Sequence, residues 1–289
     1  MPEVDYELYK LITVSGADAV QFLQGQLTQD VALLADKRSL PAACCNPQGR
    51  VITTMRLVWL GADIGMILLA EMAETVIALL RKYRMRSDVK FDSSGDEWAE
   101  IALETDADLA LLQSSGLLPD ANDSVMKNDI LATRYASSGQ FVELFGKKNA
   151  LESLNLQFDA PIETDAWQSA LIRAGVPLIS GANSEKYTPH MLNLDRLGAI
   201  SFDKGCYTGQ EVVARTEHLG SSKRRLMRYR GAANSIEVGD GLMDGDRQLG
   251  KVVNVSGEDL LAVTPVAVHD KALLLGGEVA EPVGLPYRL

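Results

Sequence analysis

The sequence predicts an α+β region followed by a small C-terminal β-barrel. Its 289 residues suit two domains or three small ones. Before residue 221, segments of strand character and helix character alternate irregularly. From residue 221 onward, short strand-like runs are separated by turns that carry Gly, Asp and Asn, and no long helical pattern occurs. We therefore place a domain boundary close to residue 221.

The elements of the first region follow from local patterns. Ser15, with an acid three residues later, starts a predicted helix that runs to about residue 34. Further helices are predicted at Glu71–Tyr83, Ala107–Gln113, Lys147–Leu156 and from Thr164 to Gly175. Strands are predicted at Ala42–Asn46, Val51–Leu60, Met66–Ala70, Val89–Phe91, Trp98–Leu103, Leu131–Tyr135 and Gln140–Phe145, the last two joined by a turn at Ser137–Gly139.

The barrel strands are predicted at Arg224–Gly231, Gly250–Val255 and Leu260–Val266. The composition supports a sizeable core, because 46% of the residues are hydrophobic and 23% are charged, close to a globular average. No apolar run reaches the roughly 18 residues of a membrane span. The N-terminal residues also lack the pattern of a secretory signal. We therefore expect a cytoplasmic protein with no membrane partner.

The net charge of −11 is unfavourable for phosphate backbones, so strong general nucleic-acid binding is not expected. Two cationic clusters run against this average. They consist of Lys223, Arg224, Arg225, Arg228 and Arg230, and of Lys82, Arg84 and Arg86. Each is either a solvated surface or an anion site for a polyglutamate tail, a phosphate or a local RNA contact.

Three cysteines are too few for a disulfide framework, and there is no Cys-x-x-Cys motif or close Cys/His cluster, so no metal site is expected. Cys44 and Cys45 are neighbours on a predicted strand, where side chains alternate between faces, which favours a structural role. His190 is interpreted as a hydrogen-bonded polar residue rather than as a ligand.

The segment Phe202–Glu211 carries the chemistry that the sequence suggests. Cys206 follows Lys204-Gly205 and precedes Gly209. Glycines allow a tight bend or a close approach of the backbone, and a nearby lysine favours the nucleophilic thiolate. The alternative is a buried, inert cysteine. Polar and glycine-rich neighbours are uncommon around a buried residue, which favours an exposed Cys206.

The run Lys204-Gly-Cys-Tyr-Thr-Gly-Gln-Glu211 resembles the signature of the YgfZ family, folate-binding relatives of the glycine-cleavage T-protein. The resemblance extends through Asn193–Phe202 and Val212–Arg215, and it includes Phe22–Val31, Asn46–Val51 and Trp167–Pro177. It covers nearly the whole chain and is weakest in the predicted barrel.

The resemblance implies two ferredoxin-like α+β subdomains and a C-terminal β-barrel around a central folate site. In this chain it places the folate-binding region at 1–220, with the second subdomain at roughly 90–160, and the barrel at 221–289. It implies tetrahydrofolate, or a one-carbon derivative, as the ligand. It also implies a role in the synthesis or repair of iron–sulfur proteins, with those proteins or their assembly machinery as partners and an indirect effect on tRNA thiomodification.

The family's reactive cysteine corresponds to Cys206, which is expected to relay sulfur, to resolve a thiol adduct or to contact a cluster. Lys204 and Glu211 are assigned with it as catalytic or orienting residues, and Glu211 is a candidate base or anchor. The alternative for these polar residues is purely structural, because a tight bend needs partners for its backbone.

The resemblance assigns folate contacts to Tyr9 and Trp167, whose rings suit a flat heterocycle. Tyr207 and Gln210 are further candidate contacts. Arg173 stands where T-proteins have a glutamate, and it is expected to pair with the folate glutamate or with a nearby acid.

A second departure is the pair Thr53 and Thr54, which stands where the T-protein has an acid. A hydroxyl cannot stabilise a developing cation as a carboxylate does, which counts against aminomethyl transfer.

Two alternatives to the accessory factor stay open. One is a folate-dependent aminomethyl or one-carbon transferase. The other is a non-catalytic folate-sensing adaptor with Lys223–Arg230 as its partner surface, so whether the protein is an enzyme is undecided.

Overall fold

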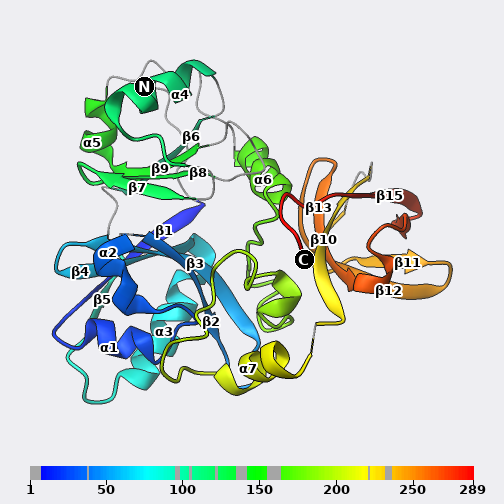
Figure 1. Ribbon diagram of the computed structural model, residues 1–289, viewed down its shortest axis with the longest axis horizontal. Coiled ribbons are helices and arrows are strands. Elements are labelled where there is room, and N and C mark those ends of the chain that lie inside the picture. Colours follow the sequence, from blue (N-terminus) through cyan, green and yellow to red (C-terminus); the bar gives the residue numbers. More distant parts are fainter. Residues whose placement is uncertain are drawn as a thin grey trace. The chain divides into compact units, whose positions relative to one another are not determined.

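A computed structural model describes the chain at residues 8–37, 39–94, 98–103, 106–120, 123–134, 142–154, 164–220, 222–231 and 236–289 (Figure 1). The chain divides into two compact units. Unit 1 comprises Met1–Gln24, Asp30–Leu40 and Met55–Trp167, and unit 2 comprises Gly25–Gln29, Pro41–Thr54 and Gln168–Leu289. Within the described part of the chain, no helix combines the length and the apolar character that crossing a bilayer requires.

The first sheet has five strands in the order β2-β3-β4-β1-β5. Their bounds are Tyr9–Ser15 (β1), Ser39–Cys45 (β2), Val51–Leu60 (β3), Asp63–Leu69 (β4) and Lys90–Asp92 (β5). The predicted strand Val51–Leu60 is confirmed to the residue. Strand β1 was not predicted from the sequence. It lies between β4 and β5, and its alternation is interrupted where Leu11 and Ile12 are both buried.

The helix predicted from Ser15 to residue 34 is wrong as a single element. The structure has α1 (Ala19–Gln24), an isolated bridge between Leu27 and Cys44, a 3-10 turn η1 (Val31–Leu33) and α2 (Leu34–Lys37). The side chain of Gln24 ends α1, because it donates to Asp30 and accepts from the amide of Val31. The helical spacing of Leu23, Leu27 and Val31 therefore marks residues that are buried, although these residues do not belong to one continuous helix.

The α3 helix (Ala73–Arg84) follows η2 (Ala70–Met72) after β4. Val76, Ile77 and Leu80 are buried, as expected for the inner face of an amphipathic helix. Tyr83, expected on that face, is 37% exposed, because the last turn of the helix extends beyond the core.

The second sheet lies in unit 1 and has the order β6-β9-β8-β7. Its strands are β6 (Trp98–Leu103), β7 (Ser124–Lys127), β8 (Ile130–Arg134) and β9 (Val142–Lys147). The predicted strand Trp98–Leu103 is confirmed, and the turn predicted at Ser137–Gly139 lies outside the described residues. Helices α4 (Asp106–Ser115) and α5 (Lys148–Ser153) lie on one side of this sheet (Figure 1). On the other face, Leu131 and Phe145 form a cluster with Leu11, Val58 and Ile67 of the first sheet.

Two acidic side chains are buried in the second sheet. Glu100 is 4% exposed and Glu143 is 6% exposed. Glu100 pairs with Phe145 across the strands and Ala102 pairs with Glu143, so both carboxyl groups lie diagonally on one face. Neither carboxyl oxygen of Glu100 has a hydrogen-bond partner among the described residues. Burial, with a smaller effect of the Glu143 charge, raises the pKa of Glu100 well above its usual 4.5.

The Glu100→Gln variant is expected to be more stable than wild type above neutral pH. Folded Glu100 keeps a proton that the unfolded chain releases, so its contribution to stability is full below pH 4.5 and falls as the pH rises through the folded-state pKa. The loss amounts to at most about 1.4 kcal/mol per pH unit. All three tryptophans, Trp59, Trp98 and Trp167, lie in unit 1. Thermal unfolding followed by their fluorescence across about pH 5 to pH 9 therefore measures the effect in this unit.

Glu74→Gln, at an exposed site on α3, is the matched control and is expected to follow wild type. An equal slope of stability against pH in Glu100→Gln and wild type would contradict the assignment of a retained proton to Glu100.

The C-terminal strands close into a barrel in the order β10-β13-β12-β11-β14-β15. They are β10 (Arg224–Arg230), β11 (Gly241–Asp244), β12 (Arg247–Ser256), β13 (Asp259–Pro265), β14 (Leu273–Leu275) and β15 (Glu278–Val283), with the 3-10 turn η5 (Val266–Val268) after β13. Tyr229, Leu242 and Leu260 are fully buried within it. The predicted fold class, α+β with a C-terminal β-barrel, is confirmed.

Most of the cationic run on β10 is used within unit 2. Arg225 forms a buried ion pair with Asp195 at 2.6 Å, and Arg228 pairs with Asp259 at 2.8 Å. Arg224 donates to the carbonyl of Leu249. These contacts leave few of its charges to form the partner surface that the adaptor hypothesis requires.

Candidate functional site

The motif segment is tied to a distant part of the chain by its lysine. Lys204 Nζ donates to the carbonyl oxygens of Leu27 and Gln29, at 2.8 and 2.7 Å. The same ammonium group lies 5.1 Å from the centre of the Tyr207 ring. Lys204 is therefore a positioning residue that holds the bend against residues 25–29 of unit 2.

The bend requires glycine at position 209. Gly209 has φ +85°, and a Cβ there would lie 2.5 Å from the carbonyl oxygen of Asn46. This residue precedes α7 (Gln210–Leu219), a helix that the sequence patterns did not reveal. At Gly205, by contrast, an added Cβ would meet nothing within 4 Å. The structure thus explains Gly209 by close packing on Asn46, and it gives no steric reason for Gly205.

The three cysteines are free, and Cys206 alone among them is exposed. Cys44 and Cys45 are both 2% exposed, and burial raises the pKa of the Cys44 thiol to about 12. Burial also raises the pKa of Cys45, with a smaller contribution from Cys44. A buried thiol that keeps its proton is a poor nucleophile, so Cys206 is the cysteine of this chain that a reagent or partner can reach.

The other motif residues make contacts within the bend. Tyr207 is 7% exposed, and burial raises the pKa of its hydroxyl. Gln210 Oε1 accepts from the amide of Tyr207 at 3.3 Å. Glu211 is highly exposed and pairs with Arg215 one helical turn later, at 2.6 Å. In unit 2, these residues shape the segment that presents Cys206.

The two predicted stacking residues come together in unit 1. Tyr9 on β1 and Trp167 on α6 (Thr164–Arg173) have ring centres 5.3 Å apart, in an edge-to-face arrangement. Trp167 is 5% exposed, and its buried Nε1 has no hydrogen-bond partner among the described residues. A buried N–H group without a partner is uncommon, and a ligand acceptor is one way to satisfy it.

Arg173, at the end of α6, is 3.5 Å from Asp259, which also pairs with Arg228. Of the two partners expected for Arg173, the structure thus contains the nearby acid. The hydroxyls of Thr53 and Thr54 donate to the carbonyls of Ile179 and Pro177, at 3.0 and 3.1 Å. These threonines therefore stabilise the backbone around them.

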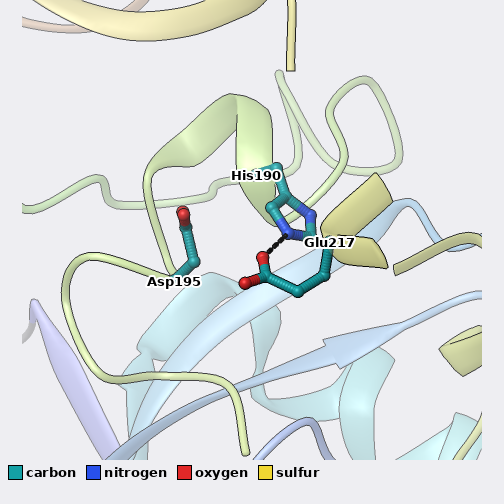
Figure 2. A group of neighbouring side chains, drawn as sticks. All are labelled: His190, Asp195 and Glu217. Carbon is teal, nitrogen blue, oxygen red and sulfur yellow. Dashed lines mark hydrogen bonds and ion pairs between the residues drawn. The ribbon is translucent and has the colours of Figure 1, made fainter. Parts of the chain in front are cut away.

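Sequence reasoning missed one polar pair. Figure 2 shows His190 and Glu217, joined at 3.1 Å between Nε2 and Oε2, with Asp195 nearby. The residues are 27 positions apart and α7 was not predicted, so no sequence pattern indicated their contact.

One ligand atom from each of His190, Asp195 and Glu217 lies within 4.8 Å of the others, which is close enough to consider a metal ion. However, one oxygen of Asp195 accepts from Arg225 at 2.6 Å, and the other lies 3.4 Å from Arg196. These guanidinium groups already balance the carboxylate and would repel a cation. We assign no metal to the group.

Comparisons with known proteins bear on the family and the fold of the chain. No family model matches the chain. A protein described as tRNA-modifying protein YgfZ from Pectobacterium carotovorum is 32% identical over 260 residues, covering 84% of this chain and 74% of the relative. One of the same description from Hamiltonella defensa is 33% identical, covering 80% and 71%. The glycine cleavage system aminomethyltransferase T of Bartonella henselae shares the fold, with a TM-score of 0.71 at 21% identity over 98% of this chain and 85% of that one.

Proposed function

The chain belongs to the family of tRNA-modifying proteins named YgfZ, and from this premise we propose that it is a tetrahydrofolate-binding accessory factor for iron–sulfur proteins. It acts in the cytoplasm on the synthesis or repair of those proteins, together with them or with their assembly machinery. Its effect on tRNA thiomodification is indirect, through the iron–sulfur enzymes that depend on it.

The observation that carries the proposal is the exposure of Cys206, in contrast to the buried Cys44 and Cys45. A thiol must be accessible to react with a partner. Lys204 anchors one side of the bend, and Gly209 packs closely on the other. This fixed backbone supports a reactive role for Cys206, because a held thiol is presented in one geometry.

The residues around Tyr9 and Trp167 suit a folate ring. The two rings offer apolar contact, and the Nε1 group of Trp167 offers a buried donor without a partner. A pterin carries both a flat face and hydrogen-bond acceptors, so it matches this combination. Tetrahydrofolate, when bound, supplies a carrier for one-carbon groups.

Replacing Trp167 is expected to weaken tetrahydrofolate binding. Trp167→Phe keeps one aromatic ring but removes the Nε1 donor and part of the ring area of the indole, so a loss of at least roughly threefold to tenfold is expected. Trp167→Ala also removes the ring contact and should weaken binding further. Titration calorimetry with tetrahydrofolate measures both variants.

Trp59→Phe is the matched control, since Trp59 lies on β3 of the same unit and makes no ring contact with Tyr9 or Trp167 within the described residues. Folate affinities equal to that of wild type in both Trp167 variants would remove the residue from the binding site.

A one-carbon transferase remains the competing function, because the fold is shared with an aminomethyltransferase. The hydroxyls of Thr53 and Thr54 are engaged with backbone carbonyls and carry no charge for a developing cation. Incubation of the purified protein with methylene-tetrahydrofolate separates the two functions: catalytic turnover would favour the transferase, and binding without turnover would favour the accessory factor.

A further inference from the structure

The end of α3 and the segment after it form a cationic surface on an acidic chain. Five of the ten residues at 81–90 are Lys or Arg and one is acidic, whereas the whole chain carries −11. Every residue from 81 to 86 is exposed. We call this region the α3 surface, and its cationic members are Arg81, Lys82, Arg84, Arg86 and Lys90.

These cationic side chains form few stabilising contacts within unit 1. Within the described ranges, none of the five pairs with an acidic side chain, in contrast to Arg225 and Arg228 in the barrel. Arg84 donates to the carbonyl of Val89. Cations in a last helical turn are favoured by the helix dipole, but Arg86 and Lys90 lie beyond the helix. The charge therefore extends further than the helix end requires.

Two large side chains among the cations keep part or most of their surface in solvent. Tyr83 is 37% exposed and Met85 is 88% exposed. Met85 also has φ +45°, a conformation that glycine adopts more easily. An exposed aromatic ring between cations offers a face on which a base can stack.

We propose that the α3 surface binds RNA, with its cations on the phosphates and Tyr83 against an unstacked base. The rest of the chain is acidic on balance and repels phosphates, which favours an encounter in which the α3 surface faces the RNA. An anionic membrane would also attract the charges, but insertion needs a broad apolar face, and here the apolar side chains are two. The inference goes beyond the proposed function, which requires neither these residues nor a direct RNA contact.

The test is fluorescence anisotropy with an unmodified tRNA transcript at several salt concentrations. The triple variant Lys82→Glu, Arg84→Glu, Arg86→Glu is expected to weaken binding at low salt by at least about tenfold, and to flatten the dependence of log K on log salt. The control is Lys223→Glu, Arg247→Glu, Lys251→Glu, which changes exposed barrel residues and the net charge by the same amount. The control is expected to bind within about threefold of wild type.

Tyr83→Ala separates stacking from charge: it should weaken binding several-fold and leave the salt dependence unchanged. Absence of tRNA binding by the wild type, or equal losses in the two triple variants, would overturn the proposal. Binding of the wild type to phosphatidylserine vesicles but not to tRNA would assign the surface to a membrane instead. Tetrahydrofolate titration of the same variants keeps this result independent of the proposed function, because the α3 variants should bind folate as wild type does.

Discussion

The Cys206→Ser variant is expected to fold like the wild type and to lose its support of iron–sulfur enzyme activity. The side chain is exposed, so replacing sulfur by oxygen should change the stability by no more than about 0.5 kcal/mol. The loss of function should be near complete, because Cys44 and Cys45 are buried with raised thiol pKa values and cannot substitute for it. Activity of an iron–sulfur enzyme in cells that depend on the variant measures the effect.

Alkylation supplies the chemical control. Native wild type should take up one iodoacetamide adduct, and Cys206→Ser should take up none, as read by intact mass. Cys44→Ala is the matched cysteine variant: it should keep function per folded molecule while it loses stability through the cavity that it leaves. Full iron–sulfur enzyme activity with Cys206→Ser would refute a chemical role for this thiol.

Arg225→Met is expected to cost unit 2 about 3–5 kcal/mol, since breaking a buried ion pair leaves one charge uncompensated. Arg225 and Asp195 each expose 8% of their side chains and are joined at 2.6 Å. Arg196, 3.4 Å from the other oxygen of Asp195, recovers part of the loss. Unit 2 contains no tryptophan, so hydrogen exchange of the amides in β10 and β13 is the suitable measurement.

The double variant Arg225→Met, Asp195→Leu should recover most of that loss, because removing both charges leaves no unpaired group in the interior. A cost below about 1 kcal/mol for Arg225→Met alone would show that the pair is solvated in solution and not buried.

Local patterns predicted those strands that are runs of strand-forming residues bounded by turn residues. Strands β3 and β6 were predicted to the residue, and the barrel strands β10, β12 and β13 were placed within about three residues. The patterns failed where distant residues decide the backbone. In the predicted N-terminal helix, the hydroxyl of Thr28 donates to the carbonyl of Ala199 and accepts from the amide of Ala43, contacts that no local window contains.

The candidate site also combines features that the local sequence predicted with features that depend on distant residues. The polar and glycine-rich neighbours of Cys206 predicted its exposure, and the φ of Gly209 agrees with the bend expected there. The carbonyl partners of Lys204 lie 177 and 175 residues away, so its role as an anchor could not be read locally. The position of Tyr9 beside Trp167 was suggested only by family resemblance, and the structure supplies the distance.

The sequence by itself determined the fold class and which cysteine is exposed, because strand-forming runs, turn residues and the neighbours of Cys206 are local properties. Tertiary structure alone decided which cationic side chains are paired within the fold and which remain free to contact a partner. It joined Arg225 to Asp195 and left the cations of the α3 surface in solvent. The physical reason is that the ion-pair partner of a charged side chain can lie far away in the sequence. The local sequence therefore does not tell whether folding pairs the charge or leaves it in water.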